Sequence, residues 1–151
     1  MKLSTFLESQ GTYVGIKLDE ASKQELVRLQ TTLRLENPLD PEKFHVTTLY
    51  SRKQVDVPTV DTVFVAKVTY IDCWKTQDGK FAVVAKLVCP ELTERHDDLI
   101  SIGGTHDYPD YSPHVTLSYD DAITPLQVDA EIRLVDEYVE PLDLRWTEDN
   151  G

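Results

Sequence analysis

Two short stretches of this sequence combine histidine and threonine in the same way. FHVTTLYS spans residues 44–51 and SPHVTLSY spans residues 112–119, so each run of strand-forming residues holds a histidine and a threonine two positions apart. Because side chains on a strand alternate between its faces, His45 and Thr47 point to one side and Val46 points to the other. The second stretch follows the same alternation. Each strand therefore presents an imidazole and a hydroxyl on one face.

Two imidazoles and two hydroxyls that converge are suited to cleaving a phosphodiester. The ordinary pKa of histidine is about 6.5, so one of His45 and His114 can be a neutral general base while the other is a protonated general acid at the same pH. The hydroxyls of Thr47 and Thr116 can donate hydrogen bonds to the non-bridging phosphate oxygens, where charge accumulates in the transition state. The sequence does not say which histidine is the base.

Other chemistry fits these residues less well. The sequence has no H-x-x-x-H pair and no paired Asp or Glu at ligand spacing beside either motif, which disfavours a metal site. Ser112 and Ser118 lack the context of a hydrolase nucleophile. We therefore expect no metal ion or other cofactor. His96, in the second predicted helix among acidic residues, is expected to be a solvated or helix-face residue, and His106 belongs to a Pro- and Asp-rich loop.

The segments around the motifs predict strands and helices in a recurring order. Asp19 is a good helix N-cap after a strand, and Pro90 suits the first position of a second helix that ends at Gly103-Gly104. Asp78-Gly79 is a turn signal and predicts a hairpin. The predicted strands cover 11–19, 44–51, 63–74, 80–89, 112–119 and 126–139, and the predicted helices cover 20 to about 35 and 90–102.

The recurring order reflects an internal repeat. Residues 14–51 align without a gap on residues 83–120, at the 69-residue offset that separates His45 from His114. Lys17 then aligns with Lys86, and both lysines are candidates for a counter-charge to phosphate.

The repeat predicts an α+β fold in which two strand-helix-strand-strand units, related by a pseudo-twofold axis, surround a central cleft. We expect one bilobal domain over residues 1–151. Its first repeat spans about 11–75, its second about 80–140, and a C-terminal segment covers 141–151.

Composition restricts the ligand class. The 151 residues suffice for one domain with a core, and no run of about 20 apolar residues suggests a membrane span. We interpret the protein as cytosolic. The 15 basic and 27 acidic residues give a net charge of −12, which disfavours a long nucleic acid because such binding needs many phosphate contacts. A small phosphorylated ligand needs only a local positive site.

The H-V-T-T motif at His45 and the H-V-T-L motif at His114 resemble the paired H-x-[T/S]-x motifs of the two-histidine phosphoesterase superfamily. The small size, the acidic composition and the text around PHVTLSY are similar to the phage anti-CBASS nucleases, which degrade cyclic di- and trinucleotide signals of a bacterial antiphage defence. The resemblance implies metal-independent cleavage of cyclic oligonucleotides, such as 3′,3′-cyclic GMP-AMP, in the cytoplasm of an infected bacterium. One histidine would deprotonate the ribose 2′-hydroxyl for attack on phosphorus, and the other would protonate the departing 5′-oxygen.

A cyclic oligonucleotide also needs partners for its bases. Stacking on an aromatic side chain contributes about 1–3 kcal/mol per base. Tyr13, Trp74 and Trp146 stand outside the obvious core positions and are candidates for this stacking. Glu140 could accept a hydrogen bond from an exocyclic amine. Resemblance to the phage family implies that the C-terminal segment, with Glu140 and Trp146, contributes to the base pocket.

Three alternatives compete with this interpretation. An RNA-end enzyme that opens 2′,3′-cyclic phosphates or cuts 2′–5′ linkages would use the same motifs, although the negative charge disfavours it. A protein that sequesters cyclic nucleotides without cleaving them would leave both H-V-T motifs unexplained. An acidic interaction module would leave the repeated histidines with structural roles only.

Overall fold

The computed structural model describes residues 10–76, 78–106 and 110–143. Its helices are α2 (Glu20–Thr32), α3 (Pro90–Ser101) and the short 3-10 helix η1 (Pro41–Lys43). Its strands are β1 (Gln10–Leu18), β2 (His45–Ser51), β3 (Phe64–Lys75), β4 (Phe81–Val88), β5 (His114–Tyr119) and β6 (Leu126–Asp143). The α+β fold and the order of the predicted elements are confirmed.

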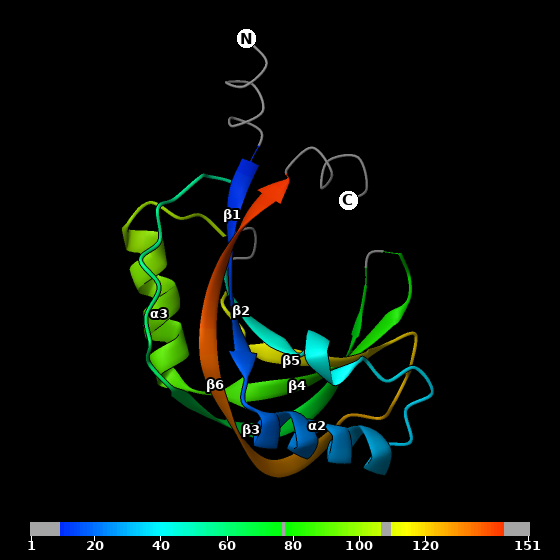
Figure 1. Cartoon of the computed structure of the whole chain (residues 1–151). Coiled ribbons are helices and arrows are strands. Elements are labelled where there is room, and N and C mark those ends of the chain that lie inside the picture. The colour runs from blue at the N-terminus through cyan, green and yellow to red at the C-terminus, as the bar shows by residue number, and fades with distance from the viewer. Residues whose placement is uncertain (1–9, 77, 107–109, 144–151) are drawn as a thin grey trace.

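The six strands form one antiparallel sheet in the order β2-β1-β6-β3-β4-β5. The two histidine strands, β2 and β5, are therefore its two edges. Cα atoms of β2 and β5 nevertheless come within 8 Å of each other, so the sheet curls until its edges meet. Figure 1 shows this arrangement, with β2 and β5 close together near the middle of the molecule.

The long strand β6 joins the two halves of the sheet. Its C-terminal part pairs with β1 and its N-terminal part pairs with β3, and Leu134 is opposite both Leu18 and Phe64. Strand β3 follows β2 along the chain but pairs with β4, in the predicted hairpin, while β6 follows β5 but pairs with β1. The two repeats have thus exchanged their last strands, and the pseudo-twofold axis relates β2 to β5, β1 to β4 and β6 to β3.

Local signals set where the helices begin and end. The Asp19 carboxylate accepts a hydrogen bond from the Ser22 amide at 2.8 Å and caps α2. Helix α2 ends at Thr32, earlier than predicted, because Arg34 adopts a left-handed conformation with φ of 55°. Pro90 occupies the first turn of α3, and Gly103, with φ of 118°, follows its end. Each helix therefore ends before a strand that carries an H-V-T motif: β2 follows α2, and β5 follows α3.

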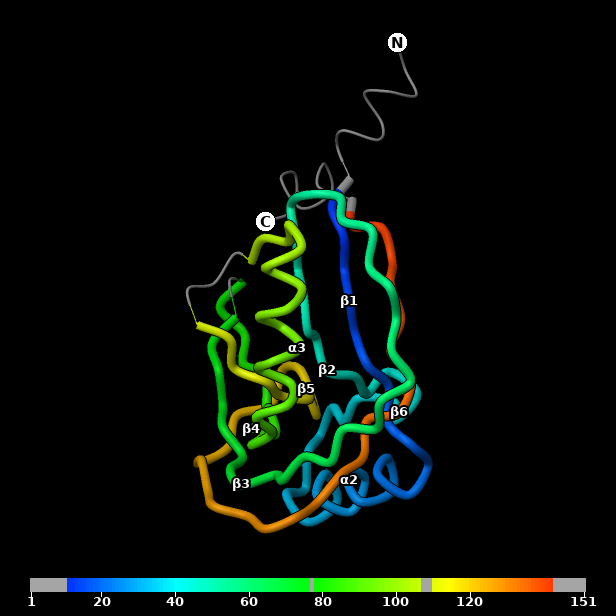
Figure 2. The backbone as a smooth tube through the Cα atoms, turned by 90° about the vertical axis from the view of Figure 1, so that its left-hand side faces the viewer, coloured from blue at the N-terminus to red at the C-terminus, as the bar shows by residue number. Residues whose placement is uncertain are grey.

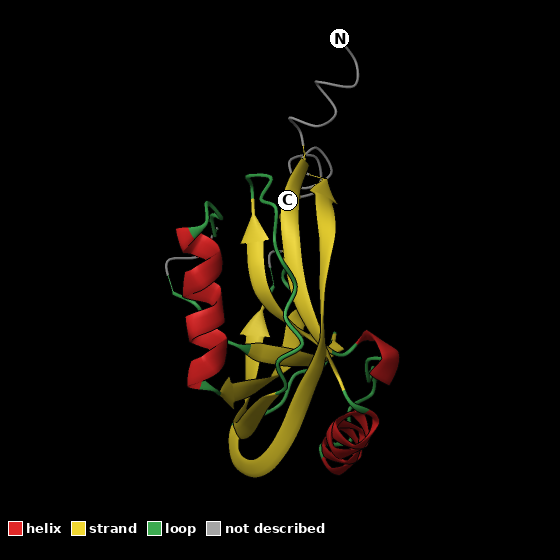
Figure 3. Cartoon of the chain, turned by 60° about the vertical axis from the view of Figure 1, so that its left-hand side comes forward, coloured by secondary structure: helices red, strands yellow, loops and turns green. Residues whose placement is uncertain are grey.

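Apolar side chains on one face of the sheet pack against both helices. The Leu26 side chain of α2 belongs to the main core cluster, and Leu99 of α3 packs in a smaller one with Val14 and Leu49. Figure 3 shows the strands lying between the two helices. Neither helix in the described part of the chain has the length and apolar character needed to span a membrane. Fully buried members of the main cluster include Ile16, Phe44, Val46, Ile71, Leu92, Leu117, Ile132 and Leu134.

The connection from β2 to β3 forms hydrogen bonds with β1, β6 and α3. Figure 2 shows it running along β1 and β6 before it enters β3. It contacts a buried ion pair in which Arg95 of α3 donates to both carboxylate oxygens of Glu137 in β6, at 2.7 and 3.0 Å. The side chain of Glu137 is only 1% exposed, and Arg95 also donates to the Pro58 carbonyl at 2.8 Å. Arg95 therefore links α3, β6 and this connection.

Replacing Arg95 with methionine should lower the free energy of unfolding by about 3 kcal/mol, because Glu137 would be left buried without its counter-charge. Urea denaturation measures this change. Arg28→Met is the matched control, since the Arg28–Glu25 pair lies on the exposed surface of α2 and should contribute little. Equal stability of the two variants would contradict a structural role for the Arg95–Glu137 pair.

Candidate active site

Each histidine strand contains a β-bulge directly after its H-V-T motif. In β2, Thr47 is opposite Gly15 and Leu49 is opposite Val14, so the intervening Thr48 has no partner in β1. A bulge re-aims the side chains around it. Here it lets both Thr48 and Leu49 turn away from solvent, while the His45 and Thr47 side chains remain on the opposite face and partly exposed.

The second bulge lies at the equivalent position. Thr116 is opposite Val84 and Ser118 is opposite Val83, which leaves Leu117 without a partner in β4. The two strands also have the same alternation of buried and partly exposed side chains up to this point. We call the sheet face that carries the two histidines and the two threonines the histidine face. The repeat seen in the sequence is therefore a repeat of backbone geometry at the site.

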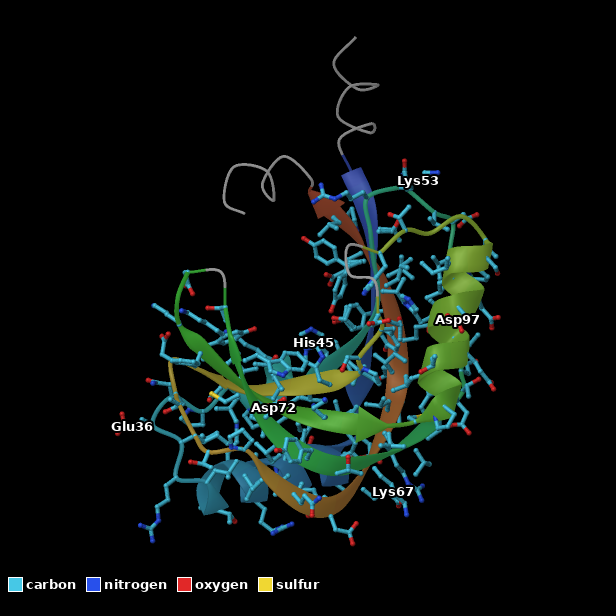
Figure 4. The ribbon with its side chains drawn as sticks, turned by 180° about the vertical axis from the view of Figure 1, so that it is seen from behind. Glu36, His45, Lys53, Lys67, Asp72 and Asp97 are labelled. Carbon is cyan, nitrogen blue, oxygen red and sulfur yellow. The ribbon has the colours of Figure 1, made fainter. Side chains whose placement is uncertain are left out.

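Both imidazole rings are oriented by the same contact. His45 Nδ1 lies 2.9 Å from the Lys43 carbonyl oxygen, and His114 Nδ1 lies 2.8 Å from that of Ser112. A carbonyl oxygen only accepts, so each Nδ1 carries a hydrogen and donates it. Nε2 of each ring is then the nitrogen that gives or takes a proton. His45 lies near the middle of the molecule in Figure 4, whereas Lys53, Lys67 and Asp97 lie at its periphery.

Strand register places a lysine beside each histidine. Lys17 is directly opposite His45 across β1 and β2, and Lys86 is directly opposite His114 across β4 and β5. Directly opposed residues share a face of the sheet, so both lysines belong to the histidine face. The Lys17 ammonium also lies 5.3 Å from the centre of the Tyr138 ring. The two lysines that were candidates for a counter-charge to phosphate therefore lie on the same sheet face as the two histidines.

His114 has an enclosed environment. Its ring meets the Trp74 ring at a centroid distance of 4.5 Å and an angle of 67°, and Trp74 Nε1 donates to the Asp72 carboxylate at 3.0 Å. Burial lowers the pKa of His114, and the nearby charges of His45 and Lys86 lower it further, against the hydrogen bond to Ser112, which raises it. His114 is therefore neutral at neutral pH.

Thr47 is in contact with a cluster of tyrosines. The Tyr13 hydroxyl lies 2.8 Å from Thr47 Oγ1, and the Tyr13 ring lies 6.1 Å from the His45 ring and 6.0 Å from the Tyr138 ring. Burial raises the pKa of Tyr13 well above its ordinary value, so its hydroxyl stays protonated. A Cβ at Gly15 would lie 2.6 Å from the Tyr138 hydroxyl, so the absence of a side chain there makes room for this ring.

The structure brings most of the predicted base-binding residues to the site. Trp74 contacts one histidine and Tyr13 the other. Glu140 is exposed and directly opposite Tyr13, and its charge contributes to the raised pKa values of Tyr13 and Tyr138. Trp146 lies outside the described residues. The roles of these four residues in binding a base remain predictions.

Sequence reasoning misplaced His96 and missed Tyr138, and both residues lie near the site. His96 is not solvated: it is 7% exposed, its Nδ1 lies 2.7 Å from the Thr48 carbonyl oxygen, and its ring stacks on Tyr111 at 4.3 Å. The solvated alternative is wrong, because the acidic neighbours of His96 occupy the outer side of α3 while His96 faces β2. Tyr138 was also missed, although a glycine inside a strand, Gly15, signals the close approach of another group.

No group of three or more His, Cys, Asp or Glu side chains in the described ranges is placed to hold a metal ion. The site as described consists of two oriented imidazoles, two hydroxyls and two ammonium groups on one sheet face.

Comparison with known proteins identifies the family. The family model described as anti-CBASS protein Acb1 matches residues 10–149. The chain belongs to this family. Among its relatives, the anti-CBASS protein Acb1 of Vibrio phage KVP40 is 79% identical over 150 residues, which is 99% of each chain. That of Enterobacteria phage T4 is 41% identical over 144 residues, or 93% of this chain and 94% of that one. The resemblance to the phage anti-CBASS proteins, inferred from the small size, the acidic composition and the text around PHVTLSY, is confirmed.

Several solved structures share this fold at low sequence identity. TT0787 of Thermus thermophilus superposes with a TM-score of 0.60 at 16% identity, over 85% of this chain and 86% of that one. E. coli LigT complexed with phosphate gives a TM-score of 0.55 at 15% identity, over 86% and 85%. A structure described as a phosphoesterase gives 0.54 at 15% identity, over 87% of each chain. The two-histidine phosphoesterase fold implied by the resemblance of the H-V-T motifs is thereby confirmed.

His114 should titrate below the ordinary histidine pKa of about 6.5, because burial disfavours its charged form. Trp74→Ala removes the indole that covers its ring and should raise this pKa toward the ordinary value, whereas Trp74→Phe should raise it less. An NMR titration of the histidine Cε1 protons measures both changes. A His114 pKa at or above that of an exposed histidine would contradict the enclosed site.

Proposed function

We propose that this protein is a metal-independent phosphodiesterase that opens cyclic di- and trinucleotides such as 3′,3′-cyclic GMP-AMP, and so removes the signals on which CBASS immunity depends. The observation that carries the proposal is the pair of H-V-T strands, each with a bulge at the same position and a histidine oriented through the same Nδ1 contact. Membership of the anti-CBASS family supports the biological role, and the phage origin of the relatives supports the cytoplasm of an infected cell as its place of action.

The two histidines take different parts in the reaction. The low pKa of His114 keeps its Nε2 unprotonated, which suits the general base that removes the proton of the ribose 2′-hydroxyl. The 2′-oxygen then forms a bond to phosphorus while the bond from phosphorus to the 5′-oxygen breaks. Nε2 of His45, as the general acid, gives its proton to that leaving oxygen. The products are a 2′,3′-cyclic phosphate and a free 5′-hydroxyl.

The other groups on the histidine face hold the phosphate. The Thr47 and Thr116 hydroxyls donate to its non-bridging oxygens, and Lys17 and Lys86 balance its charge. A positive site of this size within a chain of net charge −12 suits a small anionic ligand better than an RNA strand. The bases stack on Trp74, Tyr13 and Trp146, and Glu140 accepts from an exocyclic amine. Phosphate chemistry and base recognition are then separate functions of neighbouring residues.

Purified protein in excess EDTA should cleave 3′,3′-cyclic GMP-AMP and a cyclic trinucleotide. Replacing either His45 or His114 with alanine should lower kcat by about 10²- to 10⁴-fold, because each proton transfer loses its catalyst. Anion-exchange chromatography of the products measures the cleavage. An RNA oligonucleotide ending in a 2′,3′-cyclic phosphate, included in the same panel, should react poorly.

Three outcomes would contradict this assignment. Loss of activity in EDTA that zinc or magnesium restores would show metal-dependent chemistry. Reaction of the RNA end alone would favour the RNA-end enzyme. Recovery of intact cyclic nucleotide after the protein is denatured would show that it sequesters the ligand without cleaving it.

Tyr13→Phe should lower kcat by about five- to tenfold with little change in KM. The variant keeps the aromatic ring but removes the hydroxyl that contacts Thr47, and a hydrogen bond of this kind contributes about 1–1.5 kcal/mol. Steady-state kinetics on cyclic GMP-AMP separate the two parameters. If Tyr13 acts through stacking alone, as the sequence suggested, Tyr13→Phe leaves kcat unchanged and Tyr13→Leu raises KM.

A further inference from the structure

The free edge of β2 is covered by groups from the second repeat. An edge strand exposes backbone groups that have no partner strand, and these groups need hydrogen bonds when they are buried. His96 Nδ1 donates to the Thr48 carbonyl at 2.7 Å, and the Tyr111 hydroxyl donates to the Thr47 carbonyl at 2.7 Å. The Arg52 amide donates to Thr105 Oγ1 at 2.9 Å. These partners come from α3 and from the segment between α3 and β5.

The free edge of β5 is covered in the same way by the first repeat. Gln30 of α2 donates from Nε2 to the Leu117 carbonyl at 2.9 Å, and the Leu39 amide donates to the same oxygen at 2.8 Å. Pro38 forms a β-bridge with Ser118. The Asp121 carboxylate, just after β5, accepts from the amides of residues 36 and 37 at 2.9 Å each. These partners come from α2 and from the segment that follows it.

The two sets of contacts meet the strands at equivalent points. Thr48 and Leu117 are the bulged residues, which occupy the same position in the two repeats. Each of their carbonyls lies on the free edge of its strand, and each accepts a hydrogen bond from a helix side chain of the other repeat, His96 or Gln30. Both side chains are buried, so water cannot readily replace them. We call these two sets of hydrogen bonds the cross-ties.

We propose that His96, Tyr111 and Gln30 are positioning residues whose cross-ties fix the distance between the two H-V-T motifs. This inference rests on the proposed function, in which an acid and a base act on opposite sides of one phosphorus atom. Within the sheet the two motifs are connected only through four intervening strands, whereas each cross-tie links one repeat directly to the catalytic strand of the other. A shift of about 1 Å at a reacting group can lower a rate by about 100-fold.

The test uses variants that remove one donor and little else. Tyr111→Phe deletes the hydroxyl on the Thr47 carbonyl and keeps the ring stacked on His96, and Gln30→Met deletes the amide on the Leu117 carbonyl. Gln24→Met is the matched control, because Gln24 is an exposed residue of the same helix. His96→Asn keeps a donor near the position of Nδ1, whereas His96→Leu does not.

On cyclic GMP-AMP, Tyr111→Phe and Gln30→Met should each lower kcat by about tenfold and change KM by less than about twofold, with Gln24→Met unchanged. His96→Asn should retain more of the wild-type kcat than His96→Leu. These values are measured at a temperature where circular dichroism shows every variant to be folded. A kcat equal to wild type in both folded single variants would overturn the proposal, as would a parallel loss in Gln24→Met.

Hydrogen exchange followed by mass spectrometry supplies a readout that does not need activity. Gln30→Met should raise exchange within residues 33–39 and 114–119 while leaving 90–101 as in wild type, and Tyr111→Phe should raise it within 45–51. Exchange that rises uniformly over the chain would show a loss of global stability and overturn the cross-ties. If wild type cleaves no cyclic oligonucleotide, the proposed function fails, and these exchange patterns decide the structural claim alone.

Discussion

The whole arrangement depends on satisfying the hydrogen bonds of two edge strands. The proposed reaction uses two histidines on opposite sides of one phosphorus atom, and the chain carries these histidines on β2 and β5, the outermost strands of the sheet. Outer strands are free to approach each other when a sheet curls, but they carry backbone groups without partner strands. Helices α2 and α3, together with the connections that follow them, supply those partners. Curvature and edge protection together therefore produce the site.

A nearly symmetric backbone carries an asymmetric set of side chains. The two Nδ1 contacts, the two bulges and the two opposed lysines are equivalent in both halves. The aromatic surroundings differ, because Trp74 covers His114 while Tyr13 and Tyr138 surround Thr47. Symmetry of the backbone places equivalent groups of both halves on the histidine face. Asymmetry of the side chains encloses His114, and burial lowers the pKa of its imidazole.

The sequence predicted the features that repeat and missed those that depend on distant contacts. His45 and His114 were found because an H-V-T strand occurs twice at one offset, and the strand and helix bounds followed from Asp19, Pro90 and the Asp78-Gly79 turn. The turn at Asp78-Gly79 predicted the pairing of β3 with β4, but the pairing of β6 with β1 was not visible, because strand alternation does not specify which neighbour a strand takes. His96 was misplaced for a similar reason: its burial is set by β2, about 48 residues away in the chain.

The exchange of the last strands bears on how such a chain could have originated. A half-length ancestor with one H-V-T motif would have lacked the strand that completes its own half of the sheet, since β3 pairs with β4 and β6 pairs with β1. Two copies would have had to associate, each lending a strand to the other, and their two histidines would have been identical by symmetry. Fusion into one chain releases the two halves to mutate separately. Divergence such as that between Trp74 and Glu140, which occupy equivalent places beside Ala82 and Tyr13, became possible only then.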